Sequence, residues 1–315
     1  MNCLGKEKRP FFFMFDFELK RPVIYPLDEL PGDIIISTSL FDNSNPAKYS
    51  TSQKININAE PLGFNIYKSS FDNVISNISH GNSYLLNLTF PSKLTTDASL
   101  EEIFYMTSAK YRLLFKNEFV VFSPEIFIRI ETDGTIRSYP MKGTINASVI
   151  NAEKVIMEDE KETAEHNTIV DLIRNDLSMN AKNVRVERFR YIDRIRTNNS
   201  ELLQISSEIA GDLGQEWENR VGDIITSMLP AGSISGAPKK ETIRIIKESE
   251  IIERGYYTGV MGIYSSGELD SGVMIRFIEQ NETGYVYRSG GGITYMSQAE
   301  SEYKELIEKI YVPVG

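Results

Sequence analysis

The sequence predicts an α+β protein folded as a single large domain, with antiparallel sheets packed as a core sandwich and helices outside. Residues 119–140 alternate in the manner of strands and carry the turn pair Asp133-Gly134, which is typical of a hairpin. Residues 151–180 have helical periodicity, and long helices interleaved with hairpins indicate helices packed on an antiparallel sheet. No low-complexity linker or internal repeat divides residues 1–315, so one domain is expected.

The first ninety residues are predicted to contain short strands and one helix. The apolar run "FFFMF" at 11–15 is too short for a signal peptide and lacks a cleavage site, so a buried strand is expected. Similar short runs, broken by Pro, Gly and Asn, continue to residue 60. Apolar residues at helical spacing over 71–78 predict a helix that ends at Gly81-Asn82 and is followed by a strand from Ser83.

The second half of the chain is predicted to contain long helices and a group of strands. The helix over 151–180 is followed by another after "GAP", with Pro238 in its first turn. Residues 256–295 have the pattern of three strands joined by glycine-containing turns. Ser297 and Glu300 form a capping-box pattern, which predicts that the last helix starts there.

Composition argues against several classes of function. A net charge of -10 disfavours nucleic acid or an anionic membrane as the main partner. No apolar run approaches the ~18 residues of a membrane-spanning helix. The single cysteine, Cys3, excludes an intramolecular disulfide and a cysteine-rich zinc site. With no export signal in the sequence, the cytoplasm is the expected location.

Two pairs of glutamates are predicted to lie on apolar helix faces. In "KETAEHNTIVDLIRNDL", helical spacing from Ile169 leads back to Glu165 and Glu162. Glu302 and Glu305 form a similar pair in the last helix. For either pair alone, a first helical turn favoured by the helix dipole is an equally good explanation. Carboxylates gathered on such faces would each cost on the order of several kcal/mol unless a cation joined them. An all-oxygen ligand set predicts Mg²⁺.

Lys142 lies in an unusual local frame. It follows Pro140-Met141, where proline stiffens the chain, and precedes Gly143, which lets the backbone bend. By itself this pattern is typical of an ordinary turn lysine. Two glycine-rich stretches, "AGSISGAPKK" and "RSGGGITY", favour an anion at a helix start or the close approach of a ligand to the backbone. Each of them alone also fits a tight turn.

Several stretches taken together make the sequence resemble the chorismate-utilising enzymes. That family includes anthranilate synthase, aminodeoxychorismate synthase, isochorismate synthase and salicylate synthase. The resemblance covers residues 80–310 and implies a catalytic core there, whereas residues 1–80 are divergent. The stretches that match in order and spacing are "SPE" (123–125), "PMKGT" (140–144), "AEHNTIVDLIRNDL" (164–177), "AGSISGAPK" (231–239), "RGYYTGVMG" (254–262), "VMIRF" (273–277) and "SGGGI" (289–293).

The resemblance implies an activity that depends on Lys142. Anthranilate synthases carry alanine at this position, whereas aminodeoxychorismate synthases carry lysine. The amine is implied to attack C2 of chorismate as the C4 hydroxyl leaves, with Glu125 as the general acid that protonates the hydroxyl. Ammonia then attacks C4 and expels the lysine, giving 4-amino-4-deoxychorismate, a precursor of p-aminobenzoate and folate. A lysine enclosed near Mg²⁺ is expected to have its pKa lowered by desolvation and by the cation.

The binding residues are implied in the same way. Glu165 and Glu302 match the principal Mg²⁺ ligands of the family, with Glu162 and Glu305 close by or acting through water. Substrate binding is implied for a lysine near the metal, a threonine, a Tyr–Arg pair for the enolpyruvyl carboxylate and a glycine loop for the ring carboxylate. These residues are Lys309, Thr144, Tyr257, Arg276, Gly290, Gly291 and Gly292.

Two positions depart from the family pattern. Leu85 stands where isochorismate and salicylate synthases carry the lysine that activates water. Leucine cannot act as a base, so water addition is disfavoured. Gln204 aligns with a family histidine and can only hydrogen-bond, so no proton transfer is assigned there.

The same residues bear on two alternative functions and on an expected partner. Anthranilate synthase component I is disfavoured because Lys142 replaces alanine. A non-catalytic ligand-binding relative is disfavoured because the acid, the nucleophile and the metal ligands are all kept. The sole thiol, Cys3, has no glutamine-amidotransferase surroundings, so a separate amidotransferase subunit is expected to supply ammonia.

Overall fold

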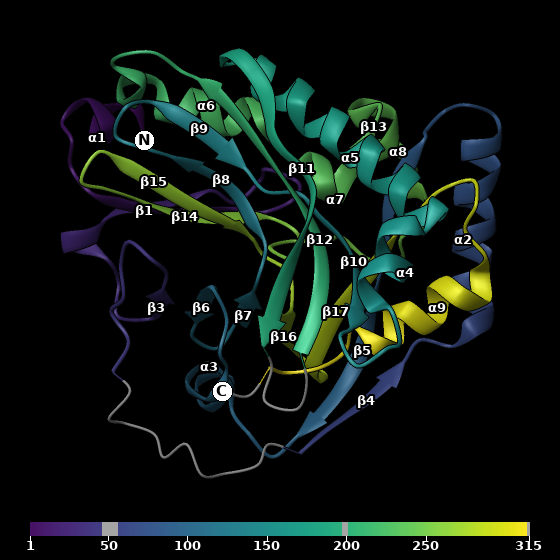
Figure 1. The fold of residues 1–315 in the computed structure, drawn as a ribbon. Helices are drawn as coiled ribbons and strands as arrows, with labels where there is room; N and C mark the ends of the chain where they lie inside the picture. The colour runs from purple at the N-terminus through teal and green to yellow at the C-terminus, as the bar shows by residue number, and fades with distance from the viewer. Residues whose placement is uncertain (46–55, 197–200, 314–315) are drawn as a thin grey trace.

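Two antiparallel sheets, packed against each other, form the centre of the computed structural model (Figure 1). The structure describes residues 1–45, 56–196 and 201–313. Helices lie on the outer faces of the two sheets, so the predicted α+β class with a core sandwich is confirmed. Part of the strand-like stretch expected up to residue 60, namely 46–55, lies outside the described residues.

The first sheet runs in the order β10-β12-β9-β8-β15-β14-β1-β2, and β11 pairs with β12 beside this path. Every pairing recorded within it is antiparallel. Its strands are β1 (Phe11–Phe15), β2 (Val23–Pro26), β8 (Ile126–Ile130), β9 (Thr135–Ser138), β10 (Met141–Asn146), β11 (Lys182–Arg196), β12 (Glu201–Asp212), β14 (Val260–Ser265) and β15 (Glu268–Val273).

The second sheet runs in the order β13-β5-β17-β16-β7-β6-β3, with β4 paired to β5. It is also antiparallel in every recorded pairing. Its strands are β3 (Ile34–Ser37), β4 (Ile57–Pro61), β5 (Leu85–Thr96), β6 (Tyr111–Phe115), β7 (Phe119–Ser123), β13 (Gly236–Ala237), β16 (Phe277–Asn281) and β17 (Gly284–Ile293).

The helices differ widely in length. Within the described ranges, none is long and apolar enough to cross a membrane. The α-helices are α1 (Asn2–Lys6), α2 (Phe64–Ser79), α3 (Leu100–Met106), α4 (Ala152–Glu158), α5 (Glu160–Ser178), α6 (Val221–Met228), α7 (Gly232–Ser235), α8 (Lys239–Ser249) and α9 (Ala299–Glu308), and the 3-10 turns are η1 (Leu27–Glu29) and η3 (Trp217–Arg220).

The alternation of side chains along β1 shows how the layers are built. All of Phe11–Phe15 is buried, as the run "FFFMF" predicts. Met14 joins the layer between the sheets, where it belongs to one cluster with Leu113 and Phe277 of the second sheet. Phe13 points the other way, into a cluster with α5 and α6. Successive strand side chains face opposite sides, so a strand covered on both faces must be apolar throughout.

The outer face of the second sheet is covered by α2, α8 and α9 (Figure 1). Tyr67 of α2, Ile245 of α8 and Leu306 of α9 are buried in one cluster with Leu88 of β5. Each helix therefore buries one apolar stripe against the sheet and leaves its other side to solvent. This packing holds α9 beside β17.

The predicted helix over 151–180 is wrong in one respect, because it is two helices. The chain is extended at Asp159, between α4 and α5. The carboxylate of Asp159 accepts a hydrogen bond from the backbone N–H of Glu162 at 2.8 Å and caps α5. Helical periodicity continues across such a break, so the capping preference of Asp is the local signal for it.

Two predicted strand groups cross from one sheet to the other. β7 belongs to the second sheet and β8 to the first, so the hairpin at Asp133-Gly134 consists of β8 and β9 alone. Residues 256–295 contain four strands rather than three, with β14 and β15 in the first sheet and β16 and β17 in the second. A crossing keeps the alternating pattern on both sides, which is why the sequence does not reveal it.

The predicted starts of α8 and α9 both differ from the observed ones. The capping box of Ser297 and Glu300 is absent: α9 begins at Ala299, and Ser297 Oγ instead accepts a hydrogen bond from the N–H of Thr294 at 3.2 Å. Pro238 is the N-cap of α8 rather than a residue of its first turn. Its extended backbone leads the chain into the helix without supplying a side-chain cap.

Candidate functional site

A group of charged side chains lies where the ends of both sheets meet α5 and α9. The three glycines Gly290–Gly292, expected as a loop, are part of strand β17 and pair with β5, and this glycine segment forms the floor of the group. A Cβ built on Gly292 would lie 3.7 Å from Lys142 Nζ and 3.9 Å from Glu165 Oε2. A Cβ on Gly291 would lie 3.7 Å from both Glu302 Oε2 and Glu305 Oε1. The absence of side chains on this segment therefore keeps open the space that these groups share.

The strand β10 aims Lys142 into this space. Its pairing with β12 shifts register between Lys142 and Thr144, and Gly143 in the bulge has φ +79°. Such a φ favours glycine, so the residue after the lysine lets the strand kink. The Lys142 ammonium lies 2.7 Å from Glu165 Oε2, and its side chain is 17% exposed. The lysine is thus an inward-facing amine and not a solvated turn residue.

In this arrangement of side chains the Lys142 pKa is raised, whereas the lowering expected beside a bound Mg²⁺ stays a prediction. Burial does lower the pKa, but attraction from Glu165, Glu162 and Glu305 outweighs burial and raises it above the usual lysine value. The expectation counted a bound cation. Without that charge, the surrounding carboxylates keep the proton on the amine.

The two glutamate pairs lie on the buried helix faces, as their spacing predicts. Glu165 and Glu302 are each 2% exposed, and Glu162 and Glu305 are half-buried. Burial and the neighbouring carboxylates Glu165 and Glu305 raise the pKa of Glu162, although Lys142 opposes them. For Glu305, burial alone would raise the pKa, but attraction from cations, chiefly Lys309, lowers it.

Two further lysines are interleaved with these carboxylates. Lys309 donates to the carbonyl oxygen of Gly290 at 3.0 Å and lies 2.6 Å from Glu305 Oε1. Lys161 lies 2.7 Å from Glu302 Oε1. The sequence analysis did not select Lys161, although its position four residues before Glu165 places both on one helix face.

The carboxylate oxygens of the four glutamates show whether this group could bind a divalent metal. Within the part of the chain that the structure describes, no three carboxylate, histidine or cysteine side chains converge closely enough to hold a metal as they stand. However, Glu165 Oε1 and Glu162 Oε2 are buried without a hydrogen-bond donor, whereas Glu165 Oε2 has the Lys142 ammonium at 2.7 Å. Buried carboxylates with unused lone pairs are the donor chemistry that a hard cation requires. The chemistry of these donors therefore fits a hard cation such as Mg²⁺.

Glu125 and Arg276 lie at the two places where the chain crosses between the sheets. The carbonyl of Glu125 accepts from the N–H of Val273 at 3.1 Å, and the carbonyl of Arg276 accepts from the N–H of Phe122 at 3.1 Å. The two crossings are therefore bonded side by side. This brings together residues that are far apart in the sequence.

The carboxyl group of Glu125 is suited to retain a proton. Ser233 Oγ donates to Glu125 Oε1 at 2.8 Å. Burial raises the Glu125 pKa, and this effect exceeds the opposing hydrogen bond from Ser233 and the attraction of Arg276 and Lys309. A carboxyl group with a raised pKa can act as a general acid closer to neutral pH. Ser233 lies in the glycine-rich stretch before α8 but was not selected from the sequence.

Arg276 is held in a strained backbone conformation next to Tyr257. Its φ is +54°, which is uncommon for a residue with a side chain and indicates local strain. The guanidinium lies 4.9 Å from the centre of the Tyr311 ring, and Nε is buried without a partner. Tyr257 is buried, and burial raises its pKa to about 12. The hydroxyl and the free guanidinium donor are available for a substrate carboxylate.

Two other residues from the sequence analysis, Thr144 and Leu85, and the neighbour of Glu165 in sequence, His166, have different surroundings. Thr144 is exposed on β10 opposite Gln204, and no contact with the charged group is recorded for it. Leu85 is buried, with Cδ1 3.3 Å from a Cβ built on Gly292, so it forms an apolar wall beside Lys142. His166 lies 2.7 Å from Ser207 Oγ, and burial lowers its pKa to about 4, so it is neutral at pH 7.

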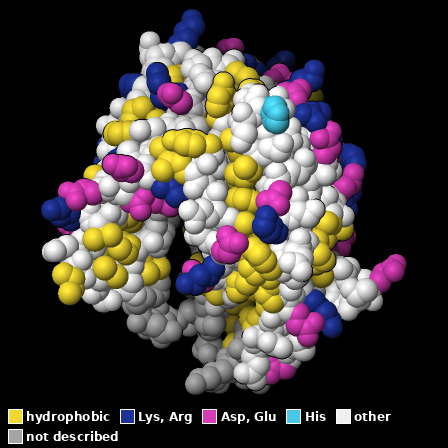
Figure 2. All heavy atoms as spheres, turned by 90° about the vertical axis from the view of Figure 1, so that its right-hand side faces the viewer, with side chains coloured by type: hydrophobic (Ala, Val, Ile, Leu, Met, Phe, Trp, Pro, Cys, Tyr) yellow, Lys and Arg dark blue, Asp and Glu magenta, His cyan; other side chains and the backbone are white. Residues whose placement is uncertain are grey.

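The surface on the side of α2 and α9 gives the setting of this group. Acidic and basic side chains are interspersed over it, and the surface is hollowed between two parts of the molecule (Figure 2). Tyr84, which directly precedes β5, and Tyr295, which lies two residues after the end of β17, are both exposed. Apolar side chains therefore reach solvent next to the elements that form the site.

The fold agrees with the comparison with protein families. Residues 26–314 match the family described as chorismate binding enzyme. The chain belongs to this family. A Haemophilus influenzae protein described as an uncharacterized PabA-like protein is 48% identical over 99% of this chain and 95% of its own length.

The descriptions of more distant relatives name an enzymatic activity. Anthranilate synthase component 1 of Aquifex aeolicus is 36% identical over 59% of this chain and 38% of its own length. Among solved structures, a putative 2,3-dihydroxybenzoate-specific isochorismate synthase from Bacillus anthracis superposes with a TM-score of 0.72 at 16% identity, over 96% of this chain and 82% of that chain. The last comparison concerns the fold alone. Membership of a family of chorismate-utilising enzymes indicates that this chain is an enzyme.

Proposed function

We propose that the protein is the chorismate-binding component of an aminodeoxychorismate synthase, which converts chorismate and ammonia into 4-amino-4-deoxychorismate with Mg²⁺ as cofactor. The observation that carries the proposal is the position of the Lys142 amine, 2.7 Å from Glu165 and beside the glycine segment. An amine in the catalytic space can form a bond to the substrate ring, which an alanine at this position cannot do. The PabA-like description of the Haemophilus relative also points to p-aminobenzoate synthesis.

The reaction assigns a distinct step to each of two side chains. Lys142, as the free amine, attacks C2 of chorismate while the two conjugated ring double bonds shift and the C4 oxygen departs. Glu125 gives its proton to that oxygen, so that water leaves. Ammonia then attacks C4, both double bonds shift back and the lysine leaves C2. The second step regenerates the lysine and yields the amino product.

The remaining residues bind and orient the two carboxylates of the substrate. Arg276 and Tyr257 receive the enolpyruvyl carboxylate, and the N–H groups of Gly290–Gly292 receive the ring carboxylate. Lys309 supplies a further positive charge beside Gly290. Leu85 keeps the space beside Lys142 apolar and provides no base for water.

The metal would be held by Glu165 and Glu302, with Glu162 and Glu305 close by. When bound, Mg²⁺ would neutralise carboxylates that otherwise hold the proton on Lys142, and would attract the substrate anion. The charge balance favours this, because four glutamates meet three lysines in this region: Glu162, Glu165, Glu302 and Glu305 against Lys142, Lys161 and Lys309.

Ammonia is proposed to come from a glutamine amidotransferase subunit. The sole thiol, Cys3, is exposed in α1. No element of the site described above belongs to that helix. Glutamine hydrolysis by a cysteine nucleophile is therefore assigned to a partner. The purified chain should use ammonium salts but not glutamine.

The test is to identify the product by mass spectrometry after incubation with chorismate, MgCl₂ and ammonium chloride at alkaline pH. The proposal predicts 4-amino-4-deoxychorismate and no pyruvate. Anthranilate together with pyruvate would instead establish anthranilate synthase component I, the activity named for the Aquifex relative. Chorismate recovered unchanged, from a protein that binds it, would indicate a non-catalytic relative.

A further inference from the structure

Lys161 is the side chain that bridges α5 and α9. It lies in the first turn of α5, and its Nζ is 2.7 Å from Glu302 Oε1 and 3.8 Å from Glu165 Oε1. Its side chain is 29% exposed, whereas those of Glu302 and Glu165 are 1% and 2% exposed. One ammonium group therefore contacts two buried carboxylates from different helices.

The three lysines of this region do not have equivalent partners. Lys142 pairs with Glu165 on the strand side, and Lys309 pairs with Glu305 within its own helical turn. For Glu302, Lys161 is the sole ion-pair partner recorded among residues 1–45, 56–196 and 201–313. Removing this ammonium without a replacement would leave a buried carboxylate unpaired, which is costly.

A metal at the same carboxylates would conflict with this ammonium. A divalent cation bound to Glu165 and Glu302 would need oxygens that Lys161 now contacts, and two cations at one oxygen repel each other. The partial exposure of Lys161 gives its flexible stem a direction in which to withdraw.

We propose that Lys161 is a tethered counter-ion of the metal site: it holds Glu165 and Glu302 in place before the metal binds, and it must leave them when the metal arrives. The inference rests on the metal assignment in the proposed function and adds a residue that sets metal affinity. Lys161 lowers the affinity for the cation and stabilises the metal-free protein. It is a positioning residue and touches no reacting atom.

The experiment compares Lys161→Met with a matched control, Lys304→Met. Lys304 lies on α9 near Glu302, but its side chain is 78% exposed and pairs with Glu308 at 3.7 Å. Calorimetric titration with MgCl₂, and with MnCl₂ as a second probe, gives the dissociation constants. We expect Lys161→Met to tighten metal binding by about five- to fiftyfold. Lys304→Met should change it by less than about twofold, because its charge is exposed and screened.

Two further measurements separate competition from general electrostatics. In EDTA, Lys161→Met should unfold at a lower temperature than the parent, and added MgCl₂ should raise its Tm by more than it raises the parent's. In the parent, Mg²⁺ should increase the acetylation of Lys161 by an amine-reactive reagent, measured by peptide mass spectrometry. Acetylation of Lys304 should not change.

The outcomes distinguish this inference from the proposed function. The inference is overturned if Lys161→Met binds the metal no more tightly than the parent does. It is also overturned if Mg²⁺ does not change the acetylation of Lys161. Either result leaves the proposed reaction intact. A parent that binds neither metal overturns both the inference and the metal assignment. If Lys161 competes with the metal but the product is anthranilate, the inference stands and the proposed reaction is rejected.

Discussion

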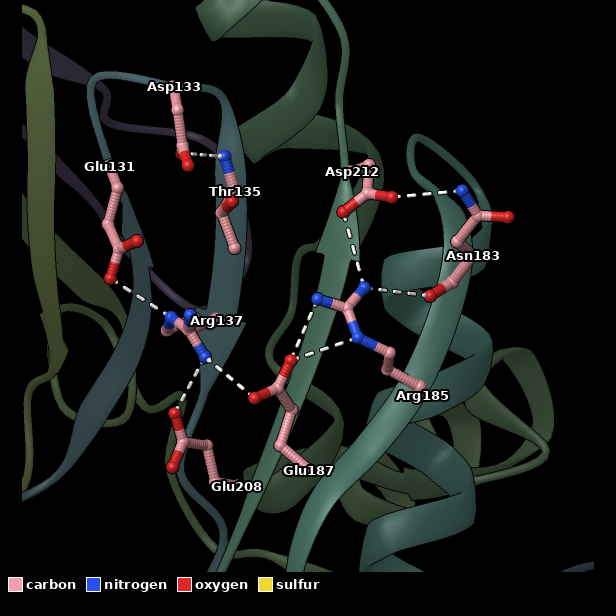
Figure 3. Close-up of polar contacts among 9 residues, drawn as sticks. All are labelled: Glu131, Asp133, Thr135, Arg137, Asn183, Arg185, Glu187, Glu208 and Asp212. Carbon is pink, nitrogen blue, oxygen red and sulfur yellow. Dashed lines mark hydrogen bonds and ion pairs between the residues drawn. The ribbon is translucent and has the colours of Figure 1, made fainter.

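Two clusters of charge in this protein contain the same kinds of group but are built in opposite ways. On the sheet surface formed by β8, β9, β11 and β12, two arginines are surrounded by carboxylates (Figure 3). Arg137 lies 2.9 Å from Glu131 and 2.7 Å from Glu208, and Arg185 lies 2.7 Å from Glu187 and 3.2 Å from Asp212. Each of these carboxylates has a guanidinium partner.

The cluster around Lys142 is buried and incompletely paired. Glu165 is 2% exposed, and its Oε1, like Glu162 Oε2, is buried without a hydrogen-bond donor. Its cations are lysines, whose single charged atom is easily displaced, whereas the surface cluster uses the rigid fork of arginine. A surface network of this kind contributes modestly to stability. A buried set with unused oxygens costs stability, and is expected where a ligand completes it. The difference supports the proposal that the cluster around Lys142 is the functional one.

The largest effect is expected for Lys142→Arg. Guanidinium keeps its charge and cannot attack the ring, so product formation should fall by about a thousandfold or more. Steady-state product formation from chorismate and ammonium measures this, with Lys304→Arg as a control that should stay near the parent rate. With ammonium withheld, intact-protein mass spectra of the parent should show a chorismate-derived adduct on Lys142. A fast Lys142→Arg enzyme without an adduct in the parent would leave Lys142 as a local cation.

The next effect compares one glutamate from each cluster. Glu165→Gln keeps the volume but removes a proposed metal ligand, so turnover should drop by about a hundredfold or more at ordinary Mg²⁺. Glu131→Gln removes a partner of Arg137 on the surface and should leave turnover unchanged. EDTA should abolish the parent's activity and MgCl₂ should restore it. Equal activity of the two variants would contradict the comparison.

A moderate effect is expected on the pH profile through Ser233. A raised Glu125 pKa means that the acid form persists to higher pH, and the rate falls as pH rises through that pKa. The Ser233 hydroxyl favours the ionised form of Glu125, so Ser233→Ala should move the alkaline limb of kcat/KM to higher pH. The change in rate at a fixed pH on that limb should be up to about tenfold. Free ammonia must be held constant across the series, and a limb that moves to lower pH would contradict the assignment of Glu125.

A smaller effect is expected on stability from Glu162→Gln. The folded-state pKa of Glu162 is raised, so the folded protein binds the extra proton more tightly and loses stability as pH rises through that pKa. Removing the charge should raise Tm in EDTA at pH 8 by roughly one to three degrees, and the gain should shrink toward acid pH. Differential scanning calorimetry over a pH series tests the sign. A lower Tm at pH 8 would show that Glu162 is well paired.

The smallest effect is expected for Arg137→Met in the surface cluster. Its carboxylate partners are partly solvated, and they can regain water when the guanidinium is removed. The free energy of unfolding should fall by about 1 kcal/mol, with the loss reduced at high salt. Chemical denaturation at two salt concentrations measures this, and the rate of turnover should not change. A loss of activity would mean that the surface network also supports the site.

Local patterns in the sequence were sufficient for the fold class and for many of the site positions. The spacing of Glu162 and Glu165 along α5, and of Glu302 and Glu305 along α9, places these carboxylates on buried faces because helical periodicity is a short-range property. The bulge after Lys142 follows from Gly143 in the same way. The resemblance to chorismate-utilising enzymes added roles for these residues, and those roles remain predictions to be tested.

The partners of these side chains were decided by the tertiary structure. The adjacency of Glu125 and Arg276 depends on two crossings between the sheets, and alternating strand patterns are the same on either side of a crossing. The bridge from Lys161 to Glu302 joins residues 141 positions apart. Whether the Lys142 pKa is raised or lowered depends on several carboxylates that converge on the amine from different helices. Coulomb interactions and burial change over a few ångströms, so which charges meet, and how far each pKa moves, depends on distances that no local sequence pattern contains.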